Sequence, residues 1–226
     1  MDRLGLSGAP KDFIARFNVS RETVINLQRY VDTLLKWQTR INLIGPATVD
    51  DIWQRHIADS LSLVQFIQER HSGGRLSFVD LGTGAGLPGI PLSLGLGPHG
   101  DVHAHLVDSN KKKAAFLREA VRLTGVSADI HTDRAERLSA YRMTPEPQFV
   151  VARAFAPLRE LSLLALPWLK AGAIGLFQKG RDVEKELETA THIEGMRYKV
   201  QSLDSVPGSV VVVTVFAPED ETNGNS

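Results

Sequence analysis

The sequence of 226 residues contains no cysteine. This absence excludes disulfide bonds, thiolate metal sites and cysteine nucleophiles, and it is compatible with a reducing compartment. The chain also has no excess of charge, because 26 basic residues balance 26 acidic ones. A strong imbalance is typical of proteins that bind nucleic acid or membrane surfaces without specificity. Any polyanionic partner must therefore meet a local basic patch.

Long apolar runs are missing as well. Residues 1–17 carry charges throughout, so we expect neither a secretory signal nor a transmembrane helix, and we expect a cytoplasmic protein without a membrane partner. The chain is long enough to form one complete hydrophobic core and an additional segment that extends it. We expect a helical extension over residues 1–74 that packs on an α/β core over residues 75–217, followed by a disordered acidic tail over residues 218–226.

The spacing of apolar residues changes near residue 74. Before that point it predicts two helices, one from Ser20 to a break at Asn42 and one from Thr48 to Ile67. Beyond it, strands and helices alternate, which predicts a mostly parallel sheet covered on both faces and closed by two antiparallel strands. The predicted strands are residues 78–80, 102–107, 128–130, 148–152, 173–177, 198–202 and 210–216, and the predicted helices are 110–125, 157–169 and 183–190.

The first predicted strand leads into a loop that is rich in glycine. Glycine admits positive φ and lets a ligand approach the backbone closely. Gly84, Gly86 and Gly89 match the dinucleotide pattern G-x-G-x-x-G, but Pro88 removes a donor from the turn that would hold the phosphates. The Asp80 carboxylate would repel a phosphate and suits a cation. We therefore predict that a cradle for the methionine end of S-adenosylmethionine is formed by Asp80, Gly82, Gly84 and Gly86. A glycine-rich turn without a ligand is the alternative.

Charged residues follow the predicted strands at the edge where open parallel sheets bind ligands. Asp108 ends the second strand, where a carboxylate can accept hydrogen bonds from the ribose hydroxyls of NAD or of S-adenosylmethionine; capping of the next helix is the alternative. Ala135 and Glu136 follow the third strand, the usual place for a backbone N–H and a carboxylate that recognise adenine. An exposed charged turn is the alternative for this pair.

Basic residues near the same edge are candidates for contacts with RNA phosphates. Lys111, Lys112 and Lys113 lie in the first turn of a predicted helix, where cations oppose the helix macrodipole. We predict that these lysines and Arg134 bind RNA, with an ordinary solvated surface as the alternative.

Arg153 and Lys179 follow the fourth and fifth predicted strands. A buried cation without a partner is costly, so each side chain should meet solvent, a carboxylate or a bound anion. We predict contacts with substrate or cofactor, and a structural salt bridge is the alternative.

Three polar residues, His56, Asp59 and Ser60, share one face of a predicted helix. A hydrolytic triad needs a rigid elbow and an oxyanion hole, and neither is evident in the sequence. We therefore favour hydrogen bonding from the helix surface against the cofactor domain. The other histidines show no metal-ligand spacing, so no metal is expected.

Taken together, these motifs resemble the bacterial 16S ribosomal RNA guanine-N7 methyltransferase family, also called glucose-inhibited division protein B. The matching motifs are residues 42–44, 55–61, 80–91, 108–113, 134–136, 153–156 and 179–180, in order along the chain. The resemblance implies a class I S-adenosylmethionine-dependent methyltransferase fold with a Rossmann-like, seven-stranded, mostly parallel sheet. It also implies cofactor contacts at Gly82, Leu87, Ala135, Glu136 and Arg153. The stretch 139–147 is longer than is typical of the family.

The family methylates N7 of a guanine in the small-subunit ribosomal RNA, near the decoding region. Guanine N7 carries a lone pair and no proton, so the reaction needs alignment more than a general base. Arg153 and Lys179 are then expected to position RNA. The expected partner is the small ribosomal subunit or its assembly intermediate, bound by a monomer. A nicotinamide-dependent oxidoreductase, a non-catalytic RNA-binding module and a methyltransferase of another RNA are the alternatives.

Overall fold

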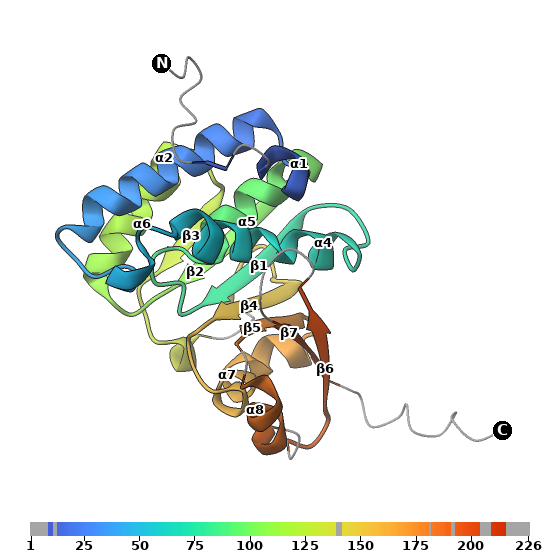
Figure 1. Ribbon diagram of the computed structural model, residues 1–226. Coiled ribbons are helices and arrows are strands. Elements are labelled where there is room, and N and C mark those ends of the chain that lie inside the picture. The colour runs from blue at the N-terminus through green and yellow to red at the C-terminus, as the bar shows by residue number, and fades with distance from the viewer. Residues whose placement is uncertain are drawn as a thin grey trace, which may run out of the picture.

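The computed structural model describes residues 9–10, 13–138, 142–180, 182–190, 193–203 and 209–215. A seven-stranded sheet with the order β3-β2-β1-β4-β5-β7-β6 lies at its centre (Figure 1). The strands are β1 (Leu76–Leu81), β2 (Val102–Val107), β3 (Ala128–His131), β4 (Phe149–Arg153), β5 (Ile174–Lys179), β6 (Met196–Ser202) and β7 (Ser209–Val215). The first five strands pair in parallel, while β7 is antiparallel to both β5 and β6. The expected mostly parallel sheet with an antiparallel end is confirmed.

Helices cover both faces of this sheet (Figure 1). One face is covered by α2 (Arg21–Gln38), α5 (Gly89–Leu96) and α6 (Lys111–Thr124), and the other by α7 (Leu158–Lys170) and α8 (Val183–Ala190). Each face has its own cluster of buried apolar side chains. Side chains alternate along a strand, so successive residues of β1 such as Phe78 and Val79 belong to different clusters.

The N-terminal helices belong to the same core as the sheet. Ser20 caps α2 by accepting a hydrogen bond from the Thr23 backbone N–H, at 3.0 Å. The apolar stripe of α2, including Leu27 and Leu34, is buried in the cluster that also holds Phe78 of β1. A short helix, α1 (Phe13–Phe17), precedes α2 and was not anticipated from the sequence.

The segment between α2 and β1 departs from the single helix that the sequence predicts. It consists of a 3₁₀ turn (Pro46–Thr48), a π-helical turn (Trp53–Ala58), α3 (Asp59–Leu61) and α4 (Leu63–Gln68). A π-helical turn is rare and often marks a functional site, because the extra residue per turn changes which side chains share a face. Here that turn carries His56 and leads directly into Asp59.

Helix α5 was not identified from the sequence either. Nearly all of its residues are buried, so it lacks the polar face that makes a helix recognisable from its periodicity. Among the described residues, no helix has both the length and the apolar character needed to cross a membrane. The expected tail over residues 218–226 lies wholly outside the described residues.

Candidate active site

The glycine loop is closed by a buried carboxylate at the end of β1. Asp80 is fully buried, and its Oδ2 accepts hydrogen bonds from the Thr83 hydroxyl at 2.6 Å and from the Gly89 backbone N–H at 2.8 Å. Burial raises the pKa of Asp80 to about 7, against the opposing effect of these two hydrogen bonds. These two hydrogen bonds fasten the turn, and a direct contact of Asp80 with the cofactor stays a prediction.

The backbone of the loop adopts conformations that glycine alone accepts easily. Gly82, Gly84 and Gly86 have φ angles of 67°, 57° and 81°. A Cβ on Gly82 would lie 2.0 Å from the Phe155 ring, whereas a Cβ on Gly84 would meet nothing closer than 3.8 Å. Gly82 is thus required by contact as well as by conformation.

A tyrosine from the N-terminal part of the chain also supports the loop. The Tyr30 hydroxyl donates a hydrogen bond to the Ala85 carbonyl oxygen at 2.6 Å, and the side chain is fully buried. Burial raises the pKa of Tyr30, so the hydroxyl keeps its proton. Sequence reasoning missed this role because Tyr30 lies on the apolar stripe of α2, where an aromatic residue indicates core packing.

Several of the predicted cofactor residues line one cavity of about 590 Å³. It is lined by Gly82, Val107, Asp108, Ser109, Asn110, Lys113, Asp133, Arg134, Ala135, Glu136, Ala154, Phe155, Ala156, Glu160 and Leu164. Asp108 accepts hydrogen bonds there from the backbone N–H groups of Gly84, at 3.1 Å, and Asn110, at 2.7 Å. The predicted residues Asp80, Gly84, Gly86 and Leu87 are not among the residues that line this cavity.

The basic residues predicted to bind RNA lie in or beside the same cavity. Asn110 caps α6 by accepting hydrogen bonds from the Lys112 and Lys113 backbone N–H groups. Lys111 and Lys112 are exposed, as is Arg134, while the Lys113 ammonium lies 3.8 Å from the Asp108 carboxylate. These positions leave Lys111 and Lys112 directed to solvent at the first turn of α6.

Arg153, the last residue of β4, joins the sheet to the π-helical turn. Its guanidinium donates hydrogen bonds to Asp59 Oδ2 and to the Arg55 carbonyl oxygen, both at 3.0 Å, and contacts His56 Nδ1 at 2.8 Å. Burial, together with the nearby charge of Arg153, lowers the pKa of His56 to about 4. Burial raises the pKa of Asp59, and Arg153 opposes that rise. The expected hydrogen bonding of His56 and Asp59 against the cofactor domain is confirmed.

Lys179, the last residue of β5, has a similar arrangement. Its ammonium donates to the Ala156 carbonyl oxygen and to Glu186 Oε2, both at 2.7 Å, and its side chain is only 6% exposed. The ammonium is engaged by a carboxylate of α8, and a contact of Lys179 with RNA stays a prediction. Both Arg153 and Lys179 form ion pairs within the chain, which is the structural alternative from the sequence.

A second cavity, of about 630 Å³, lies beside these two ion pairs. It is lined by Asp59, Arg153, Ala154, Phe155, Ala156, Pro157, Gln178, Lys179, Gly180, Glu186 and Leu203. The loop Ala154–Ala156 lines both cavities and separates them, with Ala154 at a positive φ of 49° and the Phe155 side chain 40% exposed. Sequence reasoning gave no specific role to Phe155, because a single aromatic residue in a loop carries no pattern.

The register of β2 and β3 brings together histidines that are far from any metal-ligand spacing in the sequence. His103, His105 and Asp129 place one possible ligand atom each within 4.8 Å of the others. The expectation of no metal rested on spacing along the chain, which does not reveal neighbours across a parallel pair of strands.

Comparisons with known proteins agree with this geometry. The chain is 46% identical over 179 residues to the ribosomal RNA small subunit methyltransferase G of Methylobacterium sp. (strain 4-46), covering 78% of this chain and 81% of that protein. It is 41% identical over 208 residues to the protein of the same name from Rhodospirillum centenum, covering 92% and 91%.

A solved structure shares the fold with much lower sequence identity. A putative S-adenosyl-L-methionine-dependent methyltransferase from Methanococcus maripaludis superimposes with a TM-score of 0.57 at 13% identity, covering 84% of this chain and 94% of that chain. The fold is thus the class I S-adenosylmethionine-dependent methyltransferase fold. The model of the rRNA small subunit methyltransferase G family matches residues 24–208. The chain belongs to the rRNA small subunit methyltransferase G family.

Proposed function

We propose that this chain transfers the methyl group of S-adenosylmethionine to N7 of a guanine in the 16S ribosomal RNA of the small subunit. Members of the family are S-adenosylmethionine-dependent methyltransferases, which fixes the reaction class. The observation that carries the proposal is the cavity of about 590 Å³ where Gly82, Asp108, Ala135 and Glu136 meet at the carboxyl ends of the strands.

The residues around this cavity fit the cofactor. Gly82 has no Cβ, so the Phe155 ring can pack directly against the backbone of Gly82 at the edge of the cavity. The Asp108 carboxylate is 11% exposed and retains acceptor capacity for two ribose hydroxyls. We assign Glu136 and the Ala135 backbone to the adenine, and the backbone of Gly82 to Leu87 to the methionine end. When bound, the cofactor supplies a methyl group activated by its positively charged sulfur.

The protein aligns the reactants and moves no proton. Guanine N7 has no proton to remove, and His56, the histidine at this edge, is neutral and held by Arg153. Alignment alone can lower the activation free energy by on the order of 7–11 kcal/mol in well-oriented reactions. The second cavity, separated from the first by Phe155, provides a place for the guanine beside the methyl group. The exposed Phe155 ring offers a surface on which the base can stack.

Arg153 and Lys179 act as positioning residues. Lys179 holds the Ala156 carbonyl oxygen, and Arg153 holds the turn that carries Asp59, so the two cations fix both sides of the loop that presents Phe155. Lys111, Lys112 and Arg134 are exposed beside the cofactor cavity and are assigned to RNA phosphates. The substrate is the small subunit or its assembly intermediate, reached in the cytoplasm by a monomer of this chain.

Two binding measurements and one transfer assay test the proposal. The melting temperature should rise with S-adenosylmethionine and stay unchanged with NAD. The purified protein should transfer labelled methyl groups to small subunits from cells that lack it, and far less to subunits from cells that contain it. Stabilisation by NAD alone would favour an oxidoreductase, and equal labelling of an unrelated RNA would make another RNA the substrate.

A further inference from the structure

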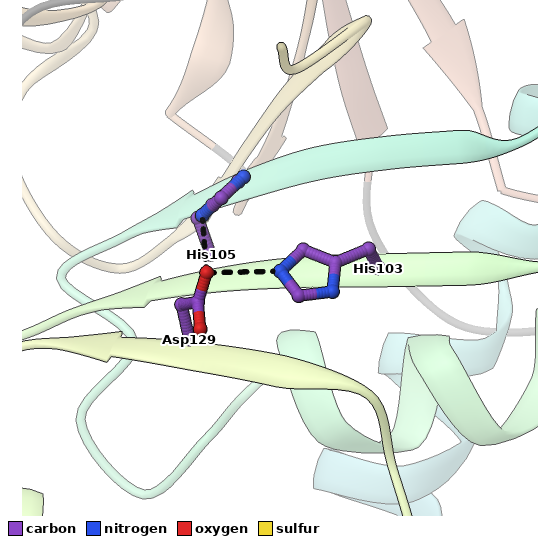
Figure 2. Close-up of side chains that lie close together, drawn as sticks. All are labelled: His103, His105 and Asp129. Atoms are coloured by element: carbon purple, nitrogen blue, oxygen red, sulfur yellow. Dashed lines mark hydrogen bonds and ion pairs between the residues drawn. The ribbon is translucent and has the colours of Figure 1, made fainter. Parts of the chain in front are cut away.

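Four side chains from two neighbouring strands converge on one face of the sheet, outside both cavities. His103 and His105 lie on β2, and Asp129 and His131 lie on β3, with His105 paired to Asp129 in the register. Figure 2 shows both imidazoles directed at the Asp129 carboxylate. Asp129 Oδ2 lies 3.2 Å from His103 Nε2 and 3.8 Å from His105 Nδ1, and His131 Nε2 lies 3.1 Å from His105 Nδ1.

Each buried imidazole is anchored by its other nitrogen. His105 Nε2 lies 2.8 Å from the Pro145 carbonyl oxygen, which can only accept, so Nε2 carries the proton and Nδ1 presents a bare lone pair. His103 Nδ1 lies 2.9 Å from the Ser127 hydroxyl, which leaves Nε2 to face Asp129. Histidines that bind metals are oriented in this way, with the second nitrogen hydrogen-bonded to a carbonyl or another polar group.

The side-chain atoms that face one another, His103 Nε2, His105 Nδ1 and Asp129 Oδ2, are spaced for a metal ion. With bonds of about 2.0–2.1 Å, the ligand atoms around a tetrahedral zinc ion lie about 3.3–3.4 Å apart. Asp129 Oδ2 lies 3.2 Å from His103 Nε2 and 3.8 Å from His105 Nδ1, close to that value, and the three ligand atoms all lie within 4.8 Å of one another.

We propose that His103, His105 and Asp129 bind a divalent transition-metal ion, with zinc as the best match. Imidazole nitrogens with a single carboxylate favour zinc over calcium or magnesium, which require more oxygen ligands. The metal would join β2 to the edge strand β3, whose following loop carries Ala135 and Glu136 into the cofactor cavity.

The test uses the full chain, stripped of metal with a chelator and titrated with zinc ions alone. We expect one strong site per chain and a rise in melting temperature with zinc. Asp129→Asn and His103→Gln should each weaken zinc affinity on the order of tenfold or more, and each should abolish the thermal shift. Asp129→Asn keeps the shape of a half-exposed side chain, so this variant is expected to fold. His99→Gln, at an exposed histidine of the 3₁₀ turn Gly97–His99, is the matched control and should bind zinc as the wild type does.

Cobalt provides an independent readout, because tetrahedral cobalt absorbs visible light far more strongly than six-coordinate cobalt. The wild type should give the intense tetrahedral spectrum, and Asp129→Asn should not. The proposal is overturned if zinc binds the wild type no more tightly than Asp129→Asn, if His99→Gln loses binding equally, or if the bound cobalt is six-coordinate. In those cases the four side chains form a hydrogen-bonded network only.

Discussion

The two cavities at the carboxyl edge of the sheet differ in how their charged residues are used. Beside β2 and β3, Lys111, Lys112 and Glu136 are exposed. Beside β4 and β5, the two cations are closed into ion pairs, Arg153 with Asp59 and Lys179 with Glu186. The same edge therefore holds charges that face solvent in one region and charges that are closed into ion pairs in the other. The position of a charged residue at a strand end shows where the charge lies. Its interaction partner is needed to show whether the charge stabilises the fold or faces solvent.

Removing Arg153 should have the largest effect, on stability. Arg153→Ala leaves Asp59 and His56 without their partner in a poorly solvated site, and breaking a buried pair typically costs about 3–5 kcal/mol. The Arg153 and Asp59 side chains are only 15% and 21% exposed. Arg55→Ala is the control, because the Arg55–Asp51 pair is 63% and 56% exposed and should contribute about 0–1 kcal/mol. Urea unfolding measures the loss of unfolding free energy in both variants. Equal losses would show that Arg153 stabilises the fold no more than a surface cation does.

Gly82→Ala should abolish most cofactor binding while Gly84→Ala should not. Both positions have positive φ, a strain of about 1–2 kcal/mol for alanine, so the two variants share that cost. Only the Gly82 Cβ collides with Phe155, at 2.0 Å. We expect S-adenosylmethionine affinity to fall on the order of 100-fold for Gly82→Ala, about 2.7 kcal/mol, and by less than about tenfold for Gly84→Ala. Calorimetric titration measures the affinity of both variants for S-adenosylmethionine. Equal losses of affinity would show that Phe155 does not define the cavity.

Lys111 and Lys112 belong to the region of exposed charges beside β2 and β3. Replacing Lys111 and Lys112 together by alanine should reduce RNA affinity and should lower the slope of log affinity against log salt by about 1.4, at about 0.7 per contact with single-stranded RNA. The exposed residues Lys185 of α8 and Lys199 of β6 give a control pair of equal charge. Filter binding across a salt series measures both slopes. An unchanged slope in the first variant would assign these lysines to ordinary solvation.

The smallest expected effect concerns pH. The folded-state pKa of His56 is lowered from 6.5 to about 4, so the unfolded chain takes up a proton before the folded chain does. The stability that this histidine contributes is complete above pH 6.5 and is lost as the pH falls toward 4. His56→Gln should therefore show a shallower fall in unfolding free energy over that window than the wild type. If unfolding free energy falls with pH equally steeply in His56→Gln and in the wild type, His56 titrates normally and Arg153 does not hold it neutral.

The sequence predicted the sheet well because buried strands and glycine turns are local signals. The strand ends carrying Asp108, Arg153 and Lys179 were placed correctly for the same reason. Partners contributed by distant segments were not predictable: Tyr30 reaches Ala85 and Arg153 reaches Asp59 across long stretches of chain. The cluster of His103, His105 and Asp129 depends on strand register, which the spacing of residues does not encode.

The central claim is methylation at N7 of a ribosomal guanine, and one measurement tests it most directly. Small subunits lacking the modification are incubated with the protein and S-adenosylmethionine, and their RNA is cleaved chemically at N7-methylguanosine. The claim predicts one new protein-dependent cleavage in 16S ribosomal RNA, which is absent with Gly82→Ala. A methyl group found on another atom or base, or no transfer by a folded protein that binds the cofactor, would contradict it.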